Sequence, residues 1–201
     1  MTQAAPTQAV PTQGAPTLGA PTQGARWKPG DRKHPSSAMV RVDQAGEYGA
    51  IRIYAGQLAV LGDRHPAARS IHHMAQQEER HRAFFDRMIV ERGVRPTVLQ
   101  PIWKVAGFAL GAVTAAISPK AAMACTAAVE TEIDKHYEEQ VVALGDSDPE
   151  LTAAILDFQA EELEHKATAI AAGAEETPGY PVLSALIRAG CKVAIATAKR
   201  I

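Results

Sequence analysis

The stretch "EELEH", residues 161–165, places a glutamate three positions before a histidine in a segment rich in helix-forming residues. Side chains at positions i and i+3 lie on one face of a helix about one turn apart, so Glu162 and His165 can reach a single metal ion. Taken alone, such a stretch is more often a charged, solvated helix face, because glutamate is a good helix former. The same pattern, however, occurs earlier in the chain, in "QEERH", residues 77–81. This repetition favours a metal site.

Two glutamates upstream complete the pattern. Glu47 precedes Glu78 by 31 residues, and Glu130 precedes Glu162 by 32 residues, and each interval accommodates one helix, a turn and part of the next helix. Two helix hairpins related by a pseudo-twofold axis would bring these side chains to one point inside a four-helix bundle. One Glu from each of two helices and Glu-x-x-His from each of the other two is the ligand set of di-iron and di-manganese carboxylate bundles. The candidate metal ligands are therefore Glu47, Glu78, His81, Glu130, Glu162 and His165.

Neighbouring acids fit this pattern less well. Glu161 and Glu164 flank Glu162, but only Glu162 reproduces the i, i+3 step of the earlier stretch. Glu132 lies about 200 degrees round the helix from Glu130, and the repeat interval favours Glu130. We therefore expect Glu161, Glu164 and Glu132 to lie outside the ligand set.

Four further residues are candidates for a second layer around the ligands. Asp43 and Asp134 each stand four positions from a proposed ligand and are candidates for orienting the two histidines. His136 and Tyr137 follow Glu130 by one to two turns, and a hydrogen bond in the bundle interior explains them as well as catalysis does. The remaining histidines match no ligand spacing and are interpreted as surface or capping residues: His34, His65, His72 and His73.

The chain predicts helices throughout its ordered part. No alternation of period two is long enough to indicate a strand, and Gly and Pro residues divide the sequence into six helical segments. We expect an all-α fold, a four-helix bundle with two additional hydrophobic or amphipathic helices. The predicted helices span residues 36–61, 66–92, 102–118, 119–144, 149–172 and 181 to the C-terminus.

An uncharged stretch raises the question of a membrane. Residues 105–119 and 121–129 carry no charge, but Pro119 and Lys120 separate them, and neither run reaches the roughly 20 residues that a transmembrane helix requires. A buried core helix is one interpretation. A helix that dips into one leaflet, with Trp103 and Lys104 at the level of the headgroups, is the other.

Composition and charge limit the function further. The chain has 201 residues, 46% of them hydrophobic, which suits one domain with a sizeable core, and its formal net charge of -1 argues against a nucleic acid partner. Residues 1–35 form a Pro/Thr/Gln/Ala repeat tail that we expect to be disordered. This tail has no charge before Arg26, unlike a secretory signal or a mitochondrial transit peptide. The folded domain is expected to span residues 36–201.

Several segments resemble the demethoxyubiquinone hydroxylases of ubiquinone biosynthesis. The similar segments are "RVDQAGEYGAIRIYAGQ" (41–57), "RPTVLQPIWKVAGFALGA" (95–112), "AMACTAAVE" (122–130), "EELEH" (161–165) and "AGCKVAIATAKRI" (189–201). The resemblance covers about residues 36–201. It places all six candidate ligands on the family's iron ligands, and His136-Tyr137 on a pair that the family carries near its site.

This resemblance implies a ferritin-like bundle with two iron ions that binds one face of a membrane and hydroxylates a polyprenyl quinol with O2 and a reductant. NADH is a candidate reductant, although the sequence has no Gly-rich dinucleotide fingerprint, so we expect no separate nicotinamide domain. The tail favours a bacterial enzyme at the cytoplasmic face of the inner membrane over an imported mitochondrial one. Other ubiquinone-biosynthesis proteins are possible partners.

Two other functions remain open at this point. A ferritin-like iron-oxidising or iron-storage protein can use a similar ligand set without an organic substrate. A metal-free bundle whose acids form salt bridges is the third interpretation. The uncharged stretch from Val105 to Val129 favours the hydroxylase, because it would suit a lipid-facing entrance for an apolar tail.

Overall fold

The computed structural model describes residues 34–201, and this part of the chain contains six α-helices, one turn of 3-10 helix and no strand. The prediction of an all-α fold is confirmed. The prediction of a disordered tail falls almost wholly on residues 1–33, which lie outside the described residues. The elements are α1 (Ser37–Leu61), α2 (Ala68–Glu91), α3 (Gln100–Ile117), α4 (Pro119–Leu144), α5 (Pro149–Ala171), the 3-10 turn η1 (Ala174–Glu176) and α6 (Tyr180–Ala198).

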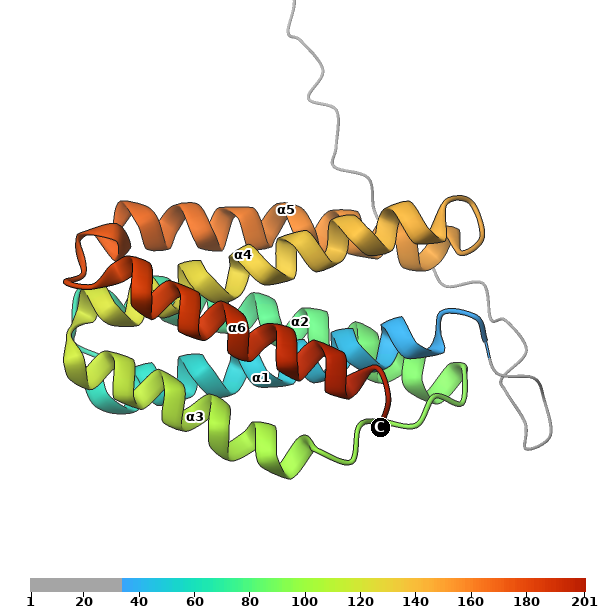
Figure 1. Ribbon diagram of the computed structural model, residues 1–201, viewed down its shortest axis with the longest axis horizontal. Helices are drawn as coiled ribbons and strands as arrows, with labels where there is room; N and C mark the ends of the chain where they lie inside the picture. The colour runs from blue at the N-terminus through green and yellow to red at the C-terminus, as the bar shows by residue number, and fades with distance from the viewer. Residues whose placement is uncertain (1–33) are drawn as a thin grey trace, which may run out of the picture.

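The helices form two similar halves. Helices α1 and α2 make one antiparallel hairpin, and α4 and α5 make the other, and the two hairpins together form the four-helix bundle (Figure 1). Helix α3 packs against α1, and α6 packs against α4, so that both lie on the outside of the bundle. Each half is therefore a hairpin followed by an apolar helix. This arrangement matches the repeat in the sequence and a ferritin-like bundle with two added helices.

The helix ends follow the local sequence closely. Ser118 caps α4 by accepting a hydrogen bond from the backbone N–H of Ala121, and Asp148 caps α5 in the same way through Leu151. A proline occupies the first turn of both helices, where its missing N–H costs nothing. The sequence predicts helix ends from such capping residues and prolines, and every predicted helix end lies within about three residues of the observed one.

Helix α3 approaches α1 unusually closely. A Cβ atom on Gly111 of α3 would lie 1.9 Å from the carbonyl oxygen of Ile53, and a Cβ on Gly56 of α1 would lie 2.1 Å from the carbonyl oxygen of Phe108. Only glycine permits this backbone-to-backbone contact. The contact fixes α3 lengthwise along α1, so α3 cannot turn away from the bundle independently.

The outward faces of α3 and α6 are apolar. Both helices are long and apolar enough to cross a membrane by length and composition alone, and little of either is buried. The exposed large side chains include Ile102, Val105, Val113 and Ile117 on α3 and Val182, Leu186 and Val193 on α6. The stretch expected to face lipid, Val105 to Val129, is corrected in its second part, because residues 121–129 are buried inside the bundle as the first turns of α4.

Candidate metal centre

The six predicted ligands lie together in the middle of the four-helix bundle. Helix α1 supplies Glu47, and α4 supplies Glu130. Helix α2 supplies Glu78 and His81, and α5 supplies Glu162 and His165. Each is at most 2% exposed. Their donor atoms form two sets, each within 4.8 Å, that share Glu78 and Glu162. We call them position 1 (Glu47, Glu78, His81 and Glu162) and position 2 (Glu78, Glu130, Glu162 and His165).

The chemistry of this cluster fits two divalent metal ions. A buried polar atom without a partner costs several kcal/mol, roughly 2–7 by transfer measurements. Among residues 34–201, atoms of five of the six side chains are buried without any hydrogen-bond partner: Glu47 Oε2, both oxygens of Glu78, His81 Nδ1, Glu130 Oε2 and Glu162 Oε1. Four carboxylates and two imidazoles with free donor atoms facing one point are the ligands that iron or manganese accepts. The cluster is thus compatible with a metal centre whose shared ligands are Glu78 and Glu162.

Protonation of the cluster shows how strongly its charges interact. Burial, with the nearby Glu162 carboxylate, raises the pKa of both Glu78 and Glu130 well above the ordinary value. Burial also acts to raise the pKa of Glu162, but the neighbouring His165 and His81 rings lower it to about 2. In the protein without metal, Glu162 therefore gives up its proton more readily than Glu78 or Glu130, and a bound cation would compete with protons for those two carboxylates.

Two tyrosines support the glutamates of the opposite hairpin. Tyr54 Oη donates a hydrogen bond of 2.9 Å to Glu130 Oε1, and Tyr137 Oη donates to Glu47 Oε1. Each tyrosine follows the glutamate of its own helix by seven residues, so the exchange obeys the pseudo-twofold symmetry. Sequence reasoning singled out Tyr137 and missed Tyr54 as a site residue. The common seven-residue spacing was the signal that would have found it.

The histidines are oriented by residues other than those predicted. His81 Nε2 lies 2.8 Å from Glu161 Oε2, and His165 Nε2 lies 3.0 Å from Gln77 Oε1. The prediction that Asp43 and Asp134 orient these rings is wrong.

Asp134 instead accepts a hydrogen bond of 2.8 Å from Gln159 on α5. Its four-residue step from Glu130 rotates it by about 40 degrees out of the inward face of α4. The residue that reaches each ring comes from the neighbouring hairpin, a contact that spacing along one helix does not reveal.

Asp43, His136 and Gln140 form a buried polar group beside the cluster. Gln140 Nε2 lies 2.6 Å from Asp43 Oδ1 and 2.7 Å from His136 Nε2, and the His136 ring nitrogen lies 3.5 Å from Asp43 Oδ1. Burial raises the pKa of Asp43, although the hydrogen bond with His136 acts in the opposite direction. This group extends from Asp43, one turn before Glu47 on α1, to His136 on α4.

The other candidates fall where the sequence predicted. Glu132 lies outside the cluster and pairs with Arg188 of α6 at 2.6 Å. Glu164 is exposed. The four remaining histidines are exposed or half-buried, and His65 accepts a hydrogen bond from a backbone N–H at the start of α2. None of them belongs to the two metal positions.

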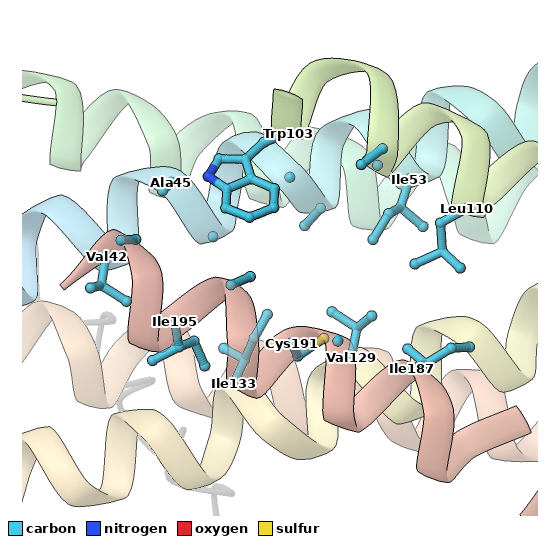
Figure 2. Close-up of a pocket in the computed structure, with 18 of the residues that line it drawn as sticks. Val42, Ala45, Ile53, Trp103, Leu110, Val129, Ile133, Ile187, Cys191 and Ile195 are labelled. Carbon is cyan, nitrogen blue, oxygen red and sulfur yellow. The ribbon is translucent and has the colours of Figure 1, made fainter. Parts of the chain in front are cut away.

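An apolar cavity of about 490 Å³ lies between the outer helices and the bundle. Trp103 and Leu110 of α3 and Ile187 and Ile195 of α6 point into it from opposite sides (Figure 2). Its floor includes Gly46 and Ala50, which bracket Glu47 on α1, and Val129 and Ile133, which bracket Glu130 on α4. The cavity therefore lies directly behind the two helices that supply the outer glutamates.

A second, polar groove of about 370 Å³ opens near the end of α6. It contains the cations Lys135, Lys192, Lys199 and Arg200 against two acids, Glu132 and Glu139, and His136 forms part of its wall. The groove thus has a cationic excess. It adjoins the buried polar group beside the metal cluster.

Comparison with protein families matches residues 34–198 to the family described as "Ubiquinone biosynthesis protein COQ7". The chain belongs to this family. The resemblance to demethoxyubiquinone hydroxylases seen in the sequence is therefore confirmed. The match spans all six helices and both metal positions.

Three curated relatives illustrate the COQ7 family. The chain is 52% identical over 178 residues to "3-demethoxyubiquinol 3-hydroxylase" of Rhodospirillum rubrum, covering 86% of this chain and 82% of the relative. It is 49% identical over 167 residues to "NADPH-dependent 3-demethoxyubiquinone 3-hydroxylase, mitochondrial" of Homo sapiens, covering 81% and 76%. It is 44% identical over 179 residues to "5-demethoxyubiquinone hydroxylase, mitochondrial" of Saccharomyces cerevisiae, covering 81% and 77%.

Proposed function

We propose that this protein is a di-iron monooxygenase that hydroxylates the ring of a demethoxyubiquinol with O2, and that residues 36–201 form its catalytic domain. The observation that carries the proposal is the pair of four-ligand positions, buried and unsatisfied, directly behind an apolar cavity. Its relatives are named as hydroxylases of this quinone or quinol. Bound iron would supply the activation of O2.

The residues of the chain would divide the remaining work. Glu78 and Glu162 would contribute ligands to both positions. Glu47 with His81 would complete position 1, and Glu130 with His165 would complete position 2. The two tyrosines would hold the outer glutamates in place. The buried surroundings exclude water. The polar group of Asp43, His136 and Gln140 would carry protons toward the Glu47 side.

The apolar cavity supports a polyprenyl quinol as the substrate. An isoprenoid tail gains about 25 cal/mol for each Å² of apolar surface that leaves water, and the cavity is lined almost wholly by aliphatic and aromatic side chains. The ring would approach the metal cluster between α1 and α4, past Ala50 and Val129. A ferritin-like storage protein, the alternative, has no use for such a cavity.

The same architecture supports a peripheral position on a membrane. Helices α3 and α6 lie lengthwise along the bundle (Figure 1). Both expose apolar side chains outward, so the protein would rest on one leaflet with the cavity toward the lipid. The close contact of Gly111 with α1 opposes a transmembrane orientation of α3 alone. We place the protein at the cytoplasmic face of a bacterial inner membrane, where other enzymes of ubiquinone biosynthesis are candidate partners.

The cationic groove is our candidate for the reductant site. Phosphate-bearing donors such as NADH or NADPH suit four neighbouring cations, and relatives are named as NADPH-dependent. Replacing Lys192 and Lys199 with alanine should raise the KM for the nicotinamide donor at unchanged iron content. Arg69→Ala, an exposed cation of α2 outside the groove, is the control.

The proposal is tested by loading the purified protein with iron in the absence of oxygen and supplying a demethoxyquinone, a nicotinamide donor and labelled oxygen gas. We expect close to two irons per chain and one labelled oxygen atom in the hydroxylated product. Iron oxidation without product would favour the storage protein. A hydroxylated product without label, whose new oxygen atom would come from water, would rule out the monooxygenase.

A further inference from the structure

The two halves of the cluster differ in contacts that their symmetry would make equal. His81 Nδ1 faces the cluster, 3.2 Å from Glu162 Oε1 and 3.6 Å from Glu47 Oε2. His165 Nδ1 faces it from the other side, 3.2 Å from Glu162 Oε2. Both rings therefore present Nδ1 to a metal position, and their Nε2 atoms point away from it.

The acceptors at the two Nε2 atoms occupy equivalent positions of the repeat but have different chemistry. Glu161 directly precedes Glu162 on α5 and reaches His81, at 2.8 Å. Gln77 directly precedes Glu78 on α2 and reaches His165, at 3.0 Å. One histidine thus faces a carboxylate and the other a neutral amide.

At a second pair of equivalent positions, the position 1 side again has the acidic group and the position 2 side the neutral one. Gln140, three residues after Tyr137, donates to Asp43, which lies four residues before Glu47. Gln57, three residues after Tyr54, donates to Thr126 at 3.3 Å, which lies four residues before Glu130. The position 1 side has a carboxyl group where the position 2 side has a hydroxyl.

We propose that Glu161 and Gln77 are positioning residues that make the two metal positions inequivalent, with the metal bound more tightly at position 1. When Nδ1 binds a metal, Nε2 carries the ring proton and donates a hydrogen bond to the outer acceptor. A carboxylate acceptor increases the electron density at Nδ1 more than an amide does, and such outer partners change metal affinity by about 10–100-fold. Arg80 binds the other oxygen of Glu161 at 2.5 Å and fixes the direction of this carboxylate.

The inference rests on the proposed metal centre, and two nearly isosteric substitutions test it in opposite directions. Glu161→Gln should weaken the tighter site about tenfold and bring the two affinities together. Gln77→Glu should strengthen the weaker site about tenfold, which a merely structural role of Gln77 would not do. The affinities are measured by anaerobic titration calorimetry with Fe(II), and helix content by circular dichroism shows whether each variant folds.

A spectroscopic measurement gives a second readout that does not depend on turnover. Mössbauer spectra of the wild type loaded with two 57Fe(II) ions per chain should show two quadrupole doublets, and the doublets should move together in Glu161→Gln. Unchanged affinities and doublets in Glu161→Gln, or weaker binding in Gln77→Glu, would overturn the inference. If Glu161→Gln does not fold, the gain expected in Gln77→Glu decides alone.

The outcomes also separate this inference from the proposed function. Two irons bound with equal affinity to the wild type would refute the inequivalence and leave the di-iron enzyme intact. Failure of the wild type to bind iron at all would refute both.

Discussion

The four inner helices and the two outer helices of this protein depart from the usual distribution of side chains in opposite directions. The inner helices bury four carboxylates and two imidazoles at one point, whereas α3 and α6 expose a series of large apolar side chains. Buried unpaired charge and exposed apolar area both cost stability. Each region therefore has a chemistry that the folded chain alone does not satisfy, and the proposed metal ions and membrane surface would satisfy it.

The largest effect is expected at the proposed metal centre of the inner region. Glu162 belongs to both metal positions, so Glu162→Gln removes a charged ligand from each at almost unchanged volume. We predict that hydroxylation falls about 1000-fold, which corresponds to about 4 kcal/mol. Incorporation of labelled oxygen from the gas into product measures the change.

Glu164→Gln is the matched control, since it makes the same chemical change two residues away on the exposed face of α5. Its turnover and iron content should equal those of the wild type. Normal turnover of Glu162→Gln would contradict the assignment of the shared ligands.

The close contact between α3 of the outer region and α1 of the inner region should show the next largest effect. Gly111→Val places a side chain where Cβ already lies 1.9 Å from the Ile53 carbonyl oxygen, so α3 must move away from α1. We predict a loss of about 3 kcal/mol in the free energy of unfolding, measured by urea denaturation. Gly190→Ala is the control, because its Cβ meets no atom within 4 Å and alanine favours a helix interior. An equal loss in both variants would show that the close contact is unimportant.

The inner region was more predictable from sequence than the outer one, for a physical reason. The six ligand positions follow from helix periodicity and a repeated interval, both of which are local properties of the chain. The partners of the ligands are not local. Glu161 and Gln77 reach their histidines across the α2–α5 interface, so spacing along one helix led wrongly to Asp43 and Asp134.

The outer region was harder to predict, because the position of its helices depends on packing that composition does not encode. Residues 105–119 and 121–129 are equally uncharged, yet the first run lies on the outside and the second inside the bundle. The break at Pro119 and Lys120 was readable, but the side of the bundle on which each run lies was not. The pattern Gly107-x-x-x-Gly111 was the available signal for close packing of α3.

The cost of the inner carboxylates without metal can be measured directly. Burial, with the nearby Glu162 carboxylate, raises the pKa of Glu78 well above its ordinary value of 4.5, so above that pH the folded, metal-free chain holds a proton there more tightly than the unfolded chain does, which costs stability. Glu78→Gln removes this cost, and we predict a gain of about 2 kcal/mol in the stability of the metal-free protein at pH 7.

The sign of the pH dependence makes this prediction specific. A raised carboxyl pKa lowers stability progressively as the pH rises above 4.5, so the advantage of Glu78→Gln should shrink as the pH falls toward that value. Urea denaturation in the presence of a chelator, across this pH range, measures it. Iron should reverse the order by stabilising the wild type more than the variant. A variant that is less stable than the metal-free wild type at pH 7 would contradict the predicted cost.

The smallest of these effects concerns the outer region and the proposed membrane contact. Val105 on α3 and Leu186 on α6 are 69% and 68% exposed, so aspartate at both positions changes the outer face without disturbing the interior. We predict that vesicle binding weakens about tenfold, or about 1.4 kcal/mol, because apolar contact with the lipid is lost and two charges must stay in water. Flotation of the protein with vesicles of neutral lipid measures the change. Val142→Asp on α4, at 80% exposure, is the control outside this face. If both variants float with vesicles as well as the wild type does, the apolar faces of α3 and α6 do not bind lipid. Urea denaturation should show that all three proteins are equally stable, so that a difference in flotation does not come from unfolding.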